Sequence, residues 1–335
     1  MAAACKCIVF CSFCSVGRTL TISYSILLQL NLDDFLGYSD KWGPSARICV
    51  QLTRKLWEEV QLQTDAEVAA EEFVKSPNAI EMETKSRVAS HSLFTTLPTD
   101  NRASYILRVE TPYLRRLVAK KMAQLDANEQ VSFYVRASKH IWFRGTLGYI
   151  FEKFVYAWLY SDPAEGELRC TAADPPNEDP EENKDPEELV LKSPGRAVLE
   201  SISGATSLKD ANKLAKANDQ KPFGWIPTSQ SFPSIDAIVC TEDRIFTIQA
   251  TIASTHSTNV AGFELVKQNL PVRFRRQREW CHLFNTDRAD TADALRLTRS
   301  ADLEERNIRI CSAVLDIGQL NFTREALELA EKLEL

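Results

Sequence analysis

Several common features are missing from this sequence, and each absence excludes a class of protein. No stretch approaches the roughly 20 consecutive apolar residues of a membrane-spanning helix, because Lys6 and Arg18 interrupt the apolar residues 1–32. No G-x-x-x-x-G-K-[ST] motif occurs, which excludes a P-loop nucleotide site. A composition of 44% hydrophobic and 26% charged residues is typical of a globular protein. We therefore expect a globular chain with no membrane partner.

The nine cysteines indicate no disulfide framework. Four of them form two pairs within residues 5–14, and the three residues between the pairs are too few for the loop of an ordinary structural zinc site. The other five are scattered, and we expect them to be buried reduced thiols of a cytosolic or nuclear protein. They are Cys49, Cys170, Cys240, Cys281 and Cys311.

The negative charge of the chain is concentrated in one segment. Residues 161–188 contain eleven Asp and Glu residues against Arg169 and Lys184, a net charge of −9, so the total of −6 leaves +3 for the remainder. Because this segment is also rich in proline and poor in apolar residues, we expect an acidic, mobile surface loop. The rest of the chain is mildly basic, which is compatible with a polyanionic partner.

The pattern of apolar residues divides the chain into three parts. These are an apolar, Cys-rich segment (1–32), a helical domain (33–140) and a second domain (141–335) that contains the acidic loop. In the second domain the periodicity predicts helices over 145–160, 207–217 and 260–270, strands over 189–192, 197–202 and 308–315, a mixed helical region after the basic run 272–280, and a terminal helix from Thr323.

Residues 233–256 predict a two-stranded hairpin. On its first strand, alternation places Asp236 on the same side as Ile238. On its second strand, Gln249 and Thr251 share one side, and the opposite side is entirely apolar. The hairpin is therefore expected to present one acid and two polar side chains.

An acid thirteen residues before a polar-x-polar strand is the layout of the PD-(D/E)xK nuclease hairpin. In that hairpin the acid and a Glu on the next strand hold a divalent metal, and a Lys orients the attacking water. Here Gln249 stands in place of the Glu and Thr251 in place of the Lys. Asp236 keeps its place, so the layout is that of the nuclease while the chemistry is altered.

A third candidate ligand lies on the predicted helix 145–160. Glu152 is flanked on the helix surface by Gly148, Val155 and Leu159, so its carboxylate is expected to be partly desolvated. The alternative is an ordinary acid at the edge of the helix. The order helix, strands, hairpin, helix, strand predicts an α/β fold, with a restriction-endonuclease-like α/β/α core and a helical N-terminal extension.

Roughly residues 140–270 resemble the C-terminal part of Crinkler effectors and retrotransposon hot spot proteins. The likeness rests on GYIFEKFVYAWL, WIPTSQSFPSIDAIV, IFTIQATIASTHS and GFELV, and more weakly on GPSARIC at 43–49. It implies functional roles for Glu152, Asp236, Gln249, Thr251 and His256. Because the P-loop ATPase of that family is missing, the chain resembles a short or truncated member, and ATP-driven activity is not expected.

The polar face of the hairpin and the acid of the preceding helix predict a Mg²⁺-dependent nuclease that acts on DNA, and the cysteines predict a nuclear or cytoplasmic protein. RNA as the substrate, a host or nuclear protein as a partner, and secretion into a host stay open as alternatives. We predict Mg²⁺ ligands at Glu152, Asp236 and Gln249. His256 is interpreted as a general base, a neighbour of the metal or a plain loop residue. Lys267 either replaces the missing strand Lys or is a solvated helix residue.

Four arginines in the run VRFRRQREW form a predicted nucleic-acid contact next to two aromatic residues, Phe274 and Trp280. They are Arg273, Arg275, Arg276 and Arg278. The alternative is a surface patch that pairs with the acidic loop.

The rival hypothesis for the whole chain is a catalytically degenerate nuclease fold that serves as a nucleic-acid- or protein-binding effector module. It rests on Gln249 and Thr251, which remove a charge from each of two functional positions and leave a neutral amide oxygen, a weaker ligand for Mg²⁺ than a carboxylate.

Overall fold

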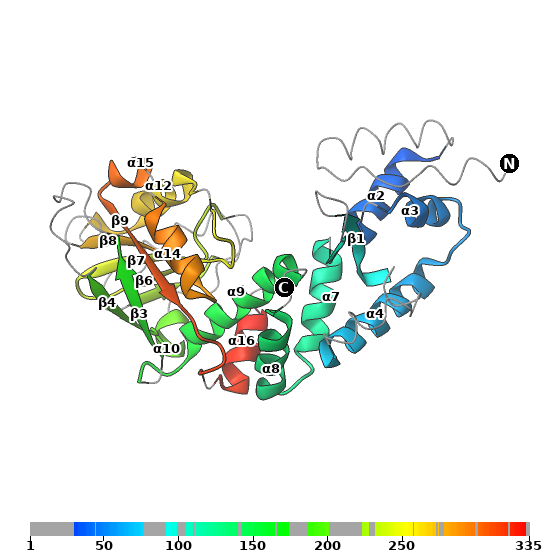
Figure 1. Cartoon of the computed structure of the whole chain (residues 1–335). Coiled ribbons are helices and arrows are strands. Elements are labelled where there is room, and N and C mark those ends of the chain that lie inside the picture. The colour runs from blue at the N-terminus through cyan, green and yellow to red at the C-terminus, as the bar shows by residue number, and fades with distance from the viewer. Residues whose placement is uncertain are drawn as a thin grey trace. The chain divides into compact units, whose positions relative to one another are not determined.

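The computed structural model of the chain forms two compact units, Met1–Leu147 and Gly148–Leu335 (Figure 1). It describes residues 30–43, 45–76, 92–98, 105–109, 111–139, 143–164, 166–173, 187–200, 223–227, 232–256, 258–272, 274, 278–298, 301–320 and 322–332. Helix α9 (Arg144–Tyr160) begins in the first unit and continues into the second.

The first unit consists mainly of helices, which agrees with the periodicity of residues 33–140. Its elements are α2 (Leu32–Trp42), α3 (Ala46–Thr53), α4 (Glu59–Lys75), β1 (Thr95–Pro98), β2 (Tyr105–Arg108), α7 (Pro112–Met122) and α8 (Ala127–Ala137). Strands β1 and β2 pair antiparallel. The fully buried ring of Phe73 on α4 contacts the rings of Phe94, Phe133 and Phe143, with centroid distances of 5.2, 5.2 and 4.7 Å.

Local sequence signals begin two of these helices. The Thr111 hydroxyl accepts a hydrogen bond from the Leu114 N–H at 3.2 Å, and Pro112 follows it in the first turn of α7. Asp126 and Glu129 form a reciprocal capping box at the start of α8. Both helices therefore begin where short-range hydrogen bonding dictates.

No helix in the described part of the chain is long and apolar enough to cross a membrane.

The second unit is a mixed α/β structure built on one sheet. Its elements after α9 are β3 (Glu167–Ala172), β4 (Glu188–Lys192), α10 (Arg196–Glu200), β5 (Phe223–Trp225), β6 (Ala237–Cys240), β7 (Arg244–Ala250), α12 (Val260–Asn269), β8 (Glu279–Thr286), α14 (Ala289–Leu297), α15 (Ala301–Glu304), β9 (Ile308–Val314) and α16 (Arg324–Lys332). The seven described strands lie in the order β4-β3-β9-β8-β7-β6-β5. Strands β7, β8 and β9 are parallel to one another, and the remaining neighbours are antiparallel.

Helices α12, α14 and α15 cover one face of this sheet. Phe263, Leu295 and Leu303, one from each helix, belong to a buried apolar cluster that also contains Ile245 of β7 and Phe284 of β8. Because side chains alternate along a strand, the odd-numbered residues of β7 and the even-numbered residues of β8 face these helices. We call this side of the sheet the α12 face.

Helix α9 lies at the opposite side of the sheet, which we call the α9 face. A Cβ atom on Gly148 would lie 3.7 Å from Cγ1 of Ile252, which continues the side of Ile248 and Ala250. No described residue of α9 belongs to the cluster under α12. Figure 1 likewise shows α9 on the side of the sheet away from α12 and α15. Coverage of both faces explains why the interior of β7 is buried throughout.

Three sequence-based expectations for this unit are wrong. Strand β3 lies within 161–188, which we expected to be a loop, and its residues Leu168, Cys170 and Ala172 are buried in alternation. Helix α10 replaces the strand expected over 197–202. Strand β8 occupies part of the region expected to be a basic run and helices. In each case pairing or packing with distant parts of the chain outweighed local composition.

Other expectations are confirmed. The hairpin forms as β6 and β7, and the predicted helices over 145–160 and 260–270 and strands over 189–192 and 308–315 are α9, α12, β4 and β9. The five scattered cysteines are buried and form no disulfide in the described part of the chain. The helix expected over 207–217 and the N-terminal cysteine pairs lie outside the described residues.

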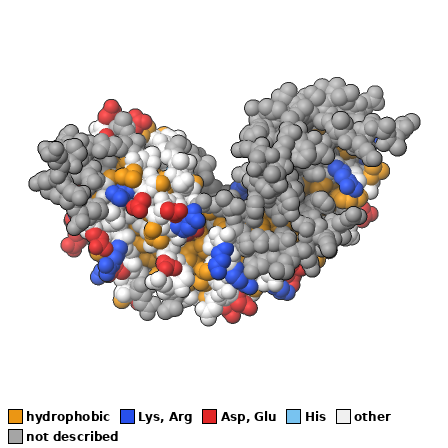
Figure 2. Space-filling view, in the orientation of Figure 1, with side chains coloured by type: hydrophobic (Ala, Val, Ile, Leu, Met, Phe, Trp, Pro, Cys, Tyr) orange, Lys and Arg blue, Asp and Glu red, His pale blue; other side chains and the backbone are white. Residues whose placement is uncertain are grey.

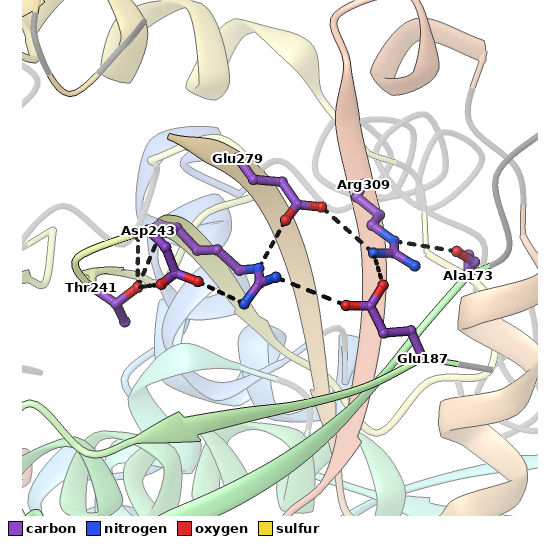
Figure 3. Close-up of polar contacts among 7 residues, drawn as sticks. Ala173, Glu187, Thr241, Asp243, Glu279 and Arg309 are labelled. Carbon is purple, nitrogen blue, oxygen red and sulfur yellow. Dashed lines mark hydrogen bonds and ion pairs between the residues drawn. The ribbon is translucent and has the colours of Figure 1, made fainter. Parts of the chain in front are cut away.

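Charged side chains join the amino-terminal ends of the three parallel strands (Figure 3). Arg244 of β7 donates to Glu279 of β8 at 2.8 Å and also pairs with Asp243. Arg309 of β9 pairs with Glu279 at 3.6 Å and with Glu187, which precedes β4. Because a carboxylate lies between the two guanidinium groups, this network connects the three parallel strands with the residue that precedes β4, at one end of the strands.

We predict that Gly262→Ala destabilises the second unit. A Cβ atom at this position of α12 would lie 2.0 Å from the backbone carbonyl oxygen of Pro233, in the loop that leads to Asp236. Overpacking of this kind costs about 1–3 kcal/mol, so thermal unfolding should begin several degrees below that of the parent chain. Gly148→Ala is the matched control, because its Cβ makes only ordinary contacts. An equal melting temperature for the two variants would contradict this packing.

Candidate functional site

Asp236, the acid of the hairpin, is turned out of the regular strand pattern. Its backbone N–H donates to the carbonyl oxygen of Ile248 at 2.8 Å, although the register partner of Ile248 is Ala237. Two residues thus lie opposite one, which is the arrangement of a β-bulge. Ile235 and Ile238 both belong to the cluster on the α12 face, so the alternation breaks between them. The expectation that Asp236 shares a side with Ile238 is therefore wrong, because the bulge turns the acid away from α12.

The structure brings the side chain of Asp236 close to Glu152 of α9. Burial and then the neighbouring Glu152 charge raise the pKa of Asp236 well above the usual range, against a hydrogen bond from the Ala250 N–H to Oδ2 at 2.7 Å. Burial also raises the pKa of Glu152, whose Oε1 accepts a hydrogen bond from the Tyr156 hydroxyl at 2.5 Å. Two carboxyl groups in one protein-enclosed place cannot both ionise without cost.

The carboxyl pair has the chemistry of a divalent-cation site. Glu152, Asp236 and the neighbouring Ala250 all remain partly exposed as whole residues. One oxygen of each carboxylate is held by a protein donor, and within the described part of the chain the second oxygen has none. Carboxylate oxygens are the ligands that Mg²⁺ and Ca²⁺ prefer, and a cation would relieve the repulsion between the two groups. These residues therefore fit a hard divalent metal.

Gln249, the third predicted ligand, points to a different place. It is an odd-numbered residue of β7 and so belongs to the α12 face, with a side chain only 5% exposed. Its Nε2 lies 3.3 Å from Nε2 of His256. A metal held jointly by Glu152, Asp236 and Gln249 would require Gln249 to leave this contact. The assignment of Gln249 as a metal ligand stays a prediction.

A buried histidine lies beside Gln249 on the same face. His282 of β8 is the register partner of Thr247, and its Nδ1 is 3.1 Å from the Thr247 hydroxyl. Burial, with a smaller contribution from His256, lowers the pKa of His282 to about 3, against a hydrogen bond with the Thr247 backbone that raises it. The imidazole is therefore neutral at physiological pH, and its ring packs against those of Phe263 and Phe284.

The remaining predicted catalytic residues have structural contacts. Thr251 is buried, and its hydroxyl accepts a hydrogen bond from the Ala253 N–H at 3.1 Å. Lys267 donates to the carbonyl oxygen of Arg306 at 3.3 Å and lies 5.3 Å from the centre of the Trp280 ring. Burial lowers the pKa of Lys267. Its ammonium group is thus directed toward α15 and β8 and is not at the carboxyl pair.

Of the four predicted nucleic-acid contacts, only Arg278 lies within the described residues. Its guanidinium group is 4.6 Å from the centre of the Phe274 ring, and it also contacts the thiol of Cys240. Arg273, Arg275 and Arg276 lie outside the described residues. In the second unit, Figure 2 shows Lys and Arg side chains interspersed with Asp and Glu on the face that it draws.

Sequence reasoning missed three polar residues of this region: Tyr156, His282 and Asn285. Tyr156 follows Glu152 by one helical turn, a spacing that predicts contact, and could have been found. His282 and Asn285 lie on β8, which we did not expect to be a strand. Their positions depend on register with β7, which no local pattern encodes.

Among the described residues, no group of three or more His, Cys, Asp or Glu side chains could hold a metal ion. The two carboxylates would therefore need neutral oxygen ligands or water to complete a coordination sphere. No protein-family model, curated protein or solved structure matches the chain.

The raised carboxyl pKa predicts a pH-dependent effect of Asp236→Asn in metal-free protein. The folded chain binds more protons than the unfolded chain between the ordinary carboxyl pKa of about 4 and the raised value, so stability is lost as pH rises through this window. Asp236→Asn removes that loss. The free energy of unfolding of Asp236→Asn, measured relative to that of the parent, should therefore increase from pH 4 to pH 7.

Urea unfolding at several pH values with a chelator present measures this difference. Asp302→Asn, on the exposed surface of α15, is the control and should show no such trend. A constant difference between Asp236→Asn and the parent across the pH range would contradict the repulsion between Asp236 and Glu152.

Proposed function

We propose that the chain is a divalent-metal-dependent nuclease with a restriction-endonuclease-like core, acting on DNA phosphodiesters. The element order supports it: α9 precedes the antiparallel strands β5, β6 and β7, and α12 then leads to β8, parallel to β7. The acid lies at the start of the middle strand and the polar pair at the end of the third, as in the PD-(D/E)xK layout. This proposal extends the resemblance to Crinkler effectors.

The observation that carries the proposal is the pairing of Glu152 with Asp236 at the ends of β6 and β7. These two residues would hold Mg²⁺, which supplies an activated water and stabilises charge on the scissile phosphate. Tyr156 fixes the Glu152 carboxylate, and the Ala250 N–H fixes that of Asp236. Both ligands are thus oriented in advance, as a metal site requires.

The second candidate function is a nuclease fold without catalysis that binds nucleic acid or a protein. It is favoured by the placement of Lys267, which contacts Arg306 and Trp280 and so does not take the role of the motif's missing Lys. The contact of Gln249 with His256 on the α12 face favours it as well. In this case the carboxyl pair would still bind metal, while DNA would be bound and left intact.

Cleavage of plasmid DNA with Mg²⁺ or Mn²⁺ tests the leading proposal. We expect Glu152→Gln and Asp236→Asn each to lower the cleavage rate by about 100-fold, since loss of a group that supports a metal typically costs 10–100-fold or more. Both variants keep the size of the parent side chain and one oxygen that can accept the hydrogen bond from Tyr156 or from the Ala250 N–H. Asp302→Asn is the surface control and should cleave like the parent.

The outcomes separate the two functions. Cleavage by the parent that both variants retain would refute the metal assignment. Metal binding by the parent without cleavage of DNA or RNA, together with nucleic-acid binding in a chelator, would favour the non-catalytic module. DNA binding that survives in Asp236→Asn while cleavage disappears supports the nuclease.

A further inference from the structure

Asn285, near the end of β8, has a buried amide without a partner. The side chain is 0% exposed, and neither Oδ1 nor Nδ2 has a hydrogen-bond partner in the described part of the chain. Buried amides are normally satisfied, and an orphaned one calls for an explanation such as a functional role or an ion. Each of the other described residues with a buried, unpaired polar side-chain atom has one such atom, whereas Asn285 has two.

The register of the sheet places this amide on the same face as the carboxyl pair. Asn285 is the partner of Ala250, and Ala250 is the residue whose N–H holds the Asp236 carboxylate. Parallel partners project to the same side, so Asn285 belongs to the α9 face with Ala250. Leu283, two residues earlier, pairs with Ile248 on that same face. Asp236 and Asn285 therefore flank Ala250 on the side from which Glu152 approaches.

The strand neighbours of Asn285 have small side chains. Its register partners on the two neighbouring strands are both alanines, Ala250 of β7 and Ala313 of β9. Ala250 is partly exposed although it lies inside a sheet covered on both faces. Ala250 of β7 is thus a neighbour of both residues, since it is the register partner of Asn285 and donates its N–H to the carboxylate of Asp236.

We propose that Oδ1 of Asn285 is the third protein ligand of the divalent cation held by Glu152 and Asp236, in the position that the motif gives to the strand residue Gln249. This inference rests on the proposed metal site. A hard cation accepts carbonyl oxygens of Asn beside carboxylates. A bound cation would coordinate the unpaired Oδ1 of Asn285 together with the unpaired carboxylate oxygens of Glu152 and Asp236. Gln249 remains with His256 on the other face of the sheet.

Calorimetric titration of the full-length chain with Mn²⁺ tests the proposal, independently of cleavage. We expect Asn285→Ala to weaken Mn²⁺ binding about tenfold, within the range for residues that support a metal. Asn285→Asp should strengthen Mn²⁺ binding, because a third carboxylate adds negative charge that attracts the cation. Ser312→Ala is the matched control, since Ser312 is a buried polar residue of β9 whose even number places it on the α12 face. Its Mn²⁺ affinity should equal that of the parent.

Thermal unfolding supplies a second readout that does not depend on Asn285→Ala being stable. In a chelator, Asn285→Asp should unfold at a lower temperature than the parent, because it places a third carboxylate beside the pair. Mn²⁺ should then raise its melting temperature by more than it raises that of the parent. A residue with only a packing role would not produce a larger metal-dependent shift.

The results distinguish failure of this inference from failure of the metal site itself. If Asp236→Asn loses Mn²⁺ binding while Asn285→Ala and Asn285→Asp bind like the parent, Asn285 is not a ligand and the carboxyl site stands. If Gln249→Ala weakens binding and Asn285→Ala does not, the ligand is the motif residue. If the parent binds no Mn²⁺, or Asp236→Asn binds it equally well, both the site and the role of Asn285 are refuted.

Discussion

The candidate site depends on a local irregularity at the start of β6. Asp236 and Ala237 both lie opposite Ile248, so the first strand has one extra residue at this point. This bulge turns the side chain of Asp236 from the α12 face to the α9 face. Without the bulge, Asp236 would lie in an apolar cluster, where an ionised carboxylate is costly. With it, the carboxylate caps the Ala250 N–H and meets Glu152. The close approach of Gly262 to Pro233 holds the preceding loop in place.

The two faces of the sheet consequently carry different polar groups. On the α9 face, burial and the charge of Glu152 raise the pKa of Asp236, so that protonation stabilises the pair. On the α12 face, Thr247, His282 and Gln249 form neutral contacts among aromatic rings. Only the first group has the charge to attract a metal. The neutral cluster more readily serves to position β7 and β8, since a histidine whose pKa is about 3 does not charge near neutral pH.

The two ends of the parallel strands also differ in their chemistry. At the amino-terminal ends, Arg244, Glu279 and Arg309 neutralise one another in a network. At the carboxyl-terminal ends, Asp236 and Asn285 lie around Ala250 with unpaired oxygens. Ligands of open α/β sheets are commonly bound at the carboxyl-terminal ends of the strands. Ion pairs thus connect the strands at one end of this sheet, and polar groups with unpaired oxygens lie at the other end.

The sequence by itself determined the main helices and the hairpin, because periods of 3.6 and 2 and the spacing of turn residues are local properties of the chain. It also singled out Glu152 and Asp236 as candidate residues, while the bulge that turns Asp236 toward Glu152 belongs to the tertiary structure. Only the tertiary structure decided that β8 is a strand, that Gln249 meets His256, and that Asn285 lies beside Ala250. Those features follow from which strand pairs with which and in what register, and from one bulge that reverses the direction of a side chain. Pairing partners far apart in the chain set them, so no pattern within a single segment can reveal them.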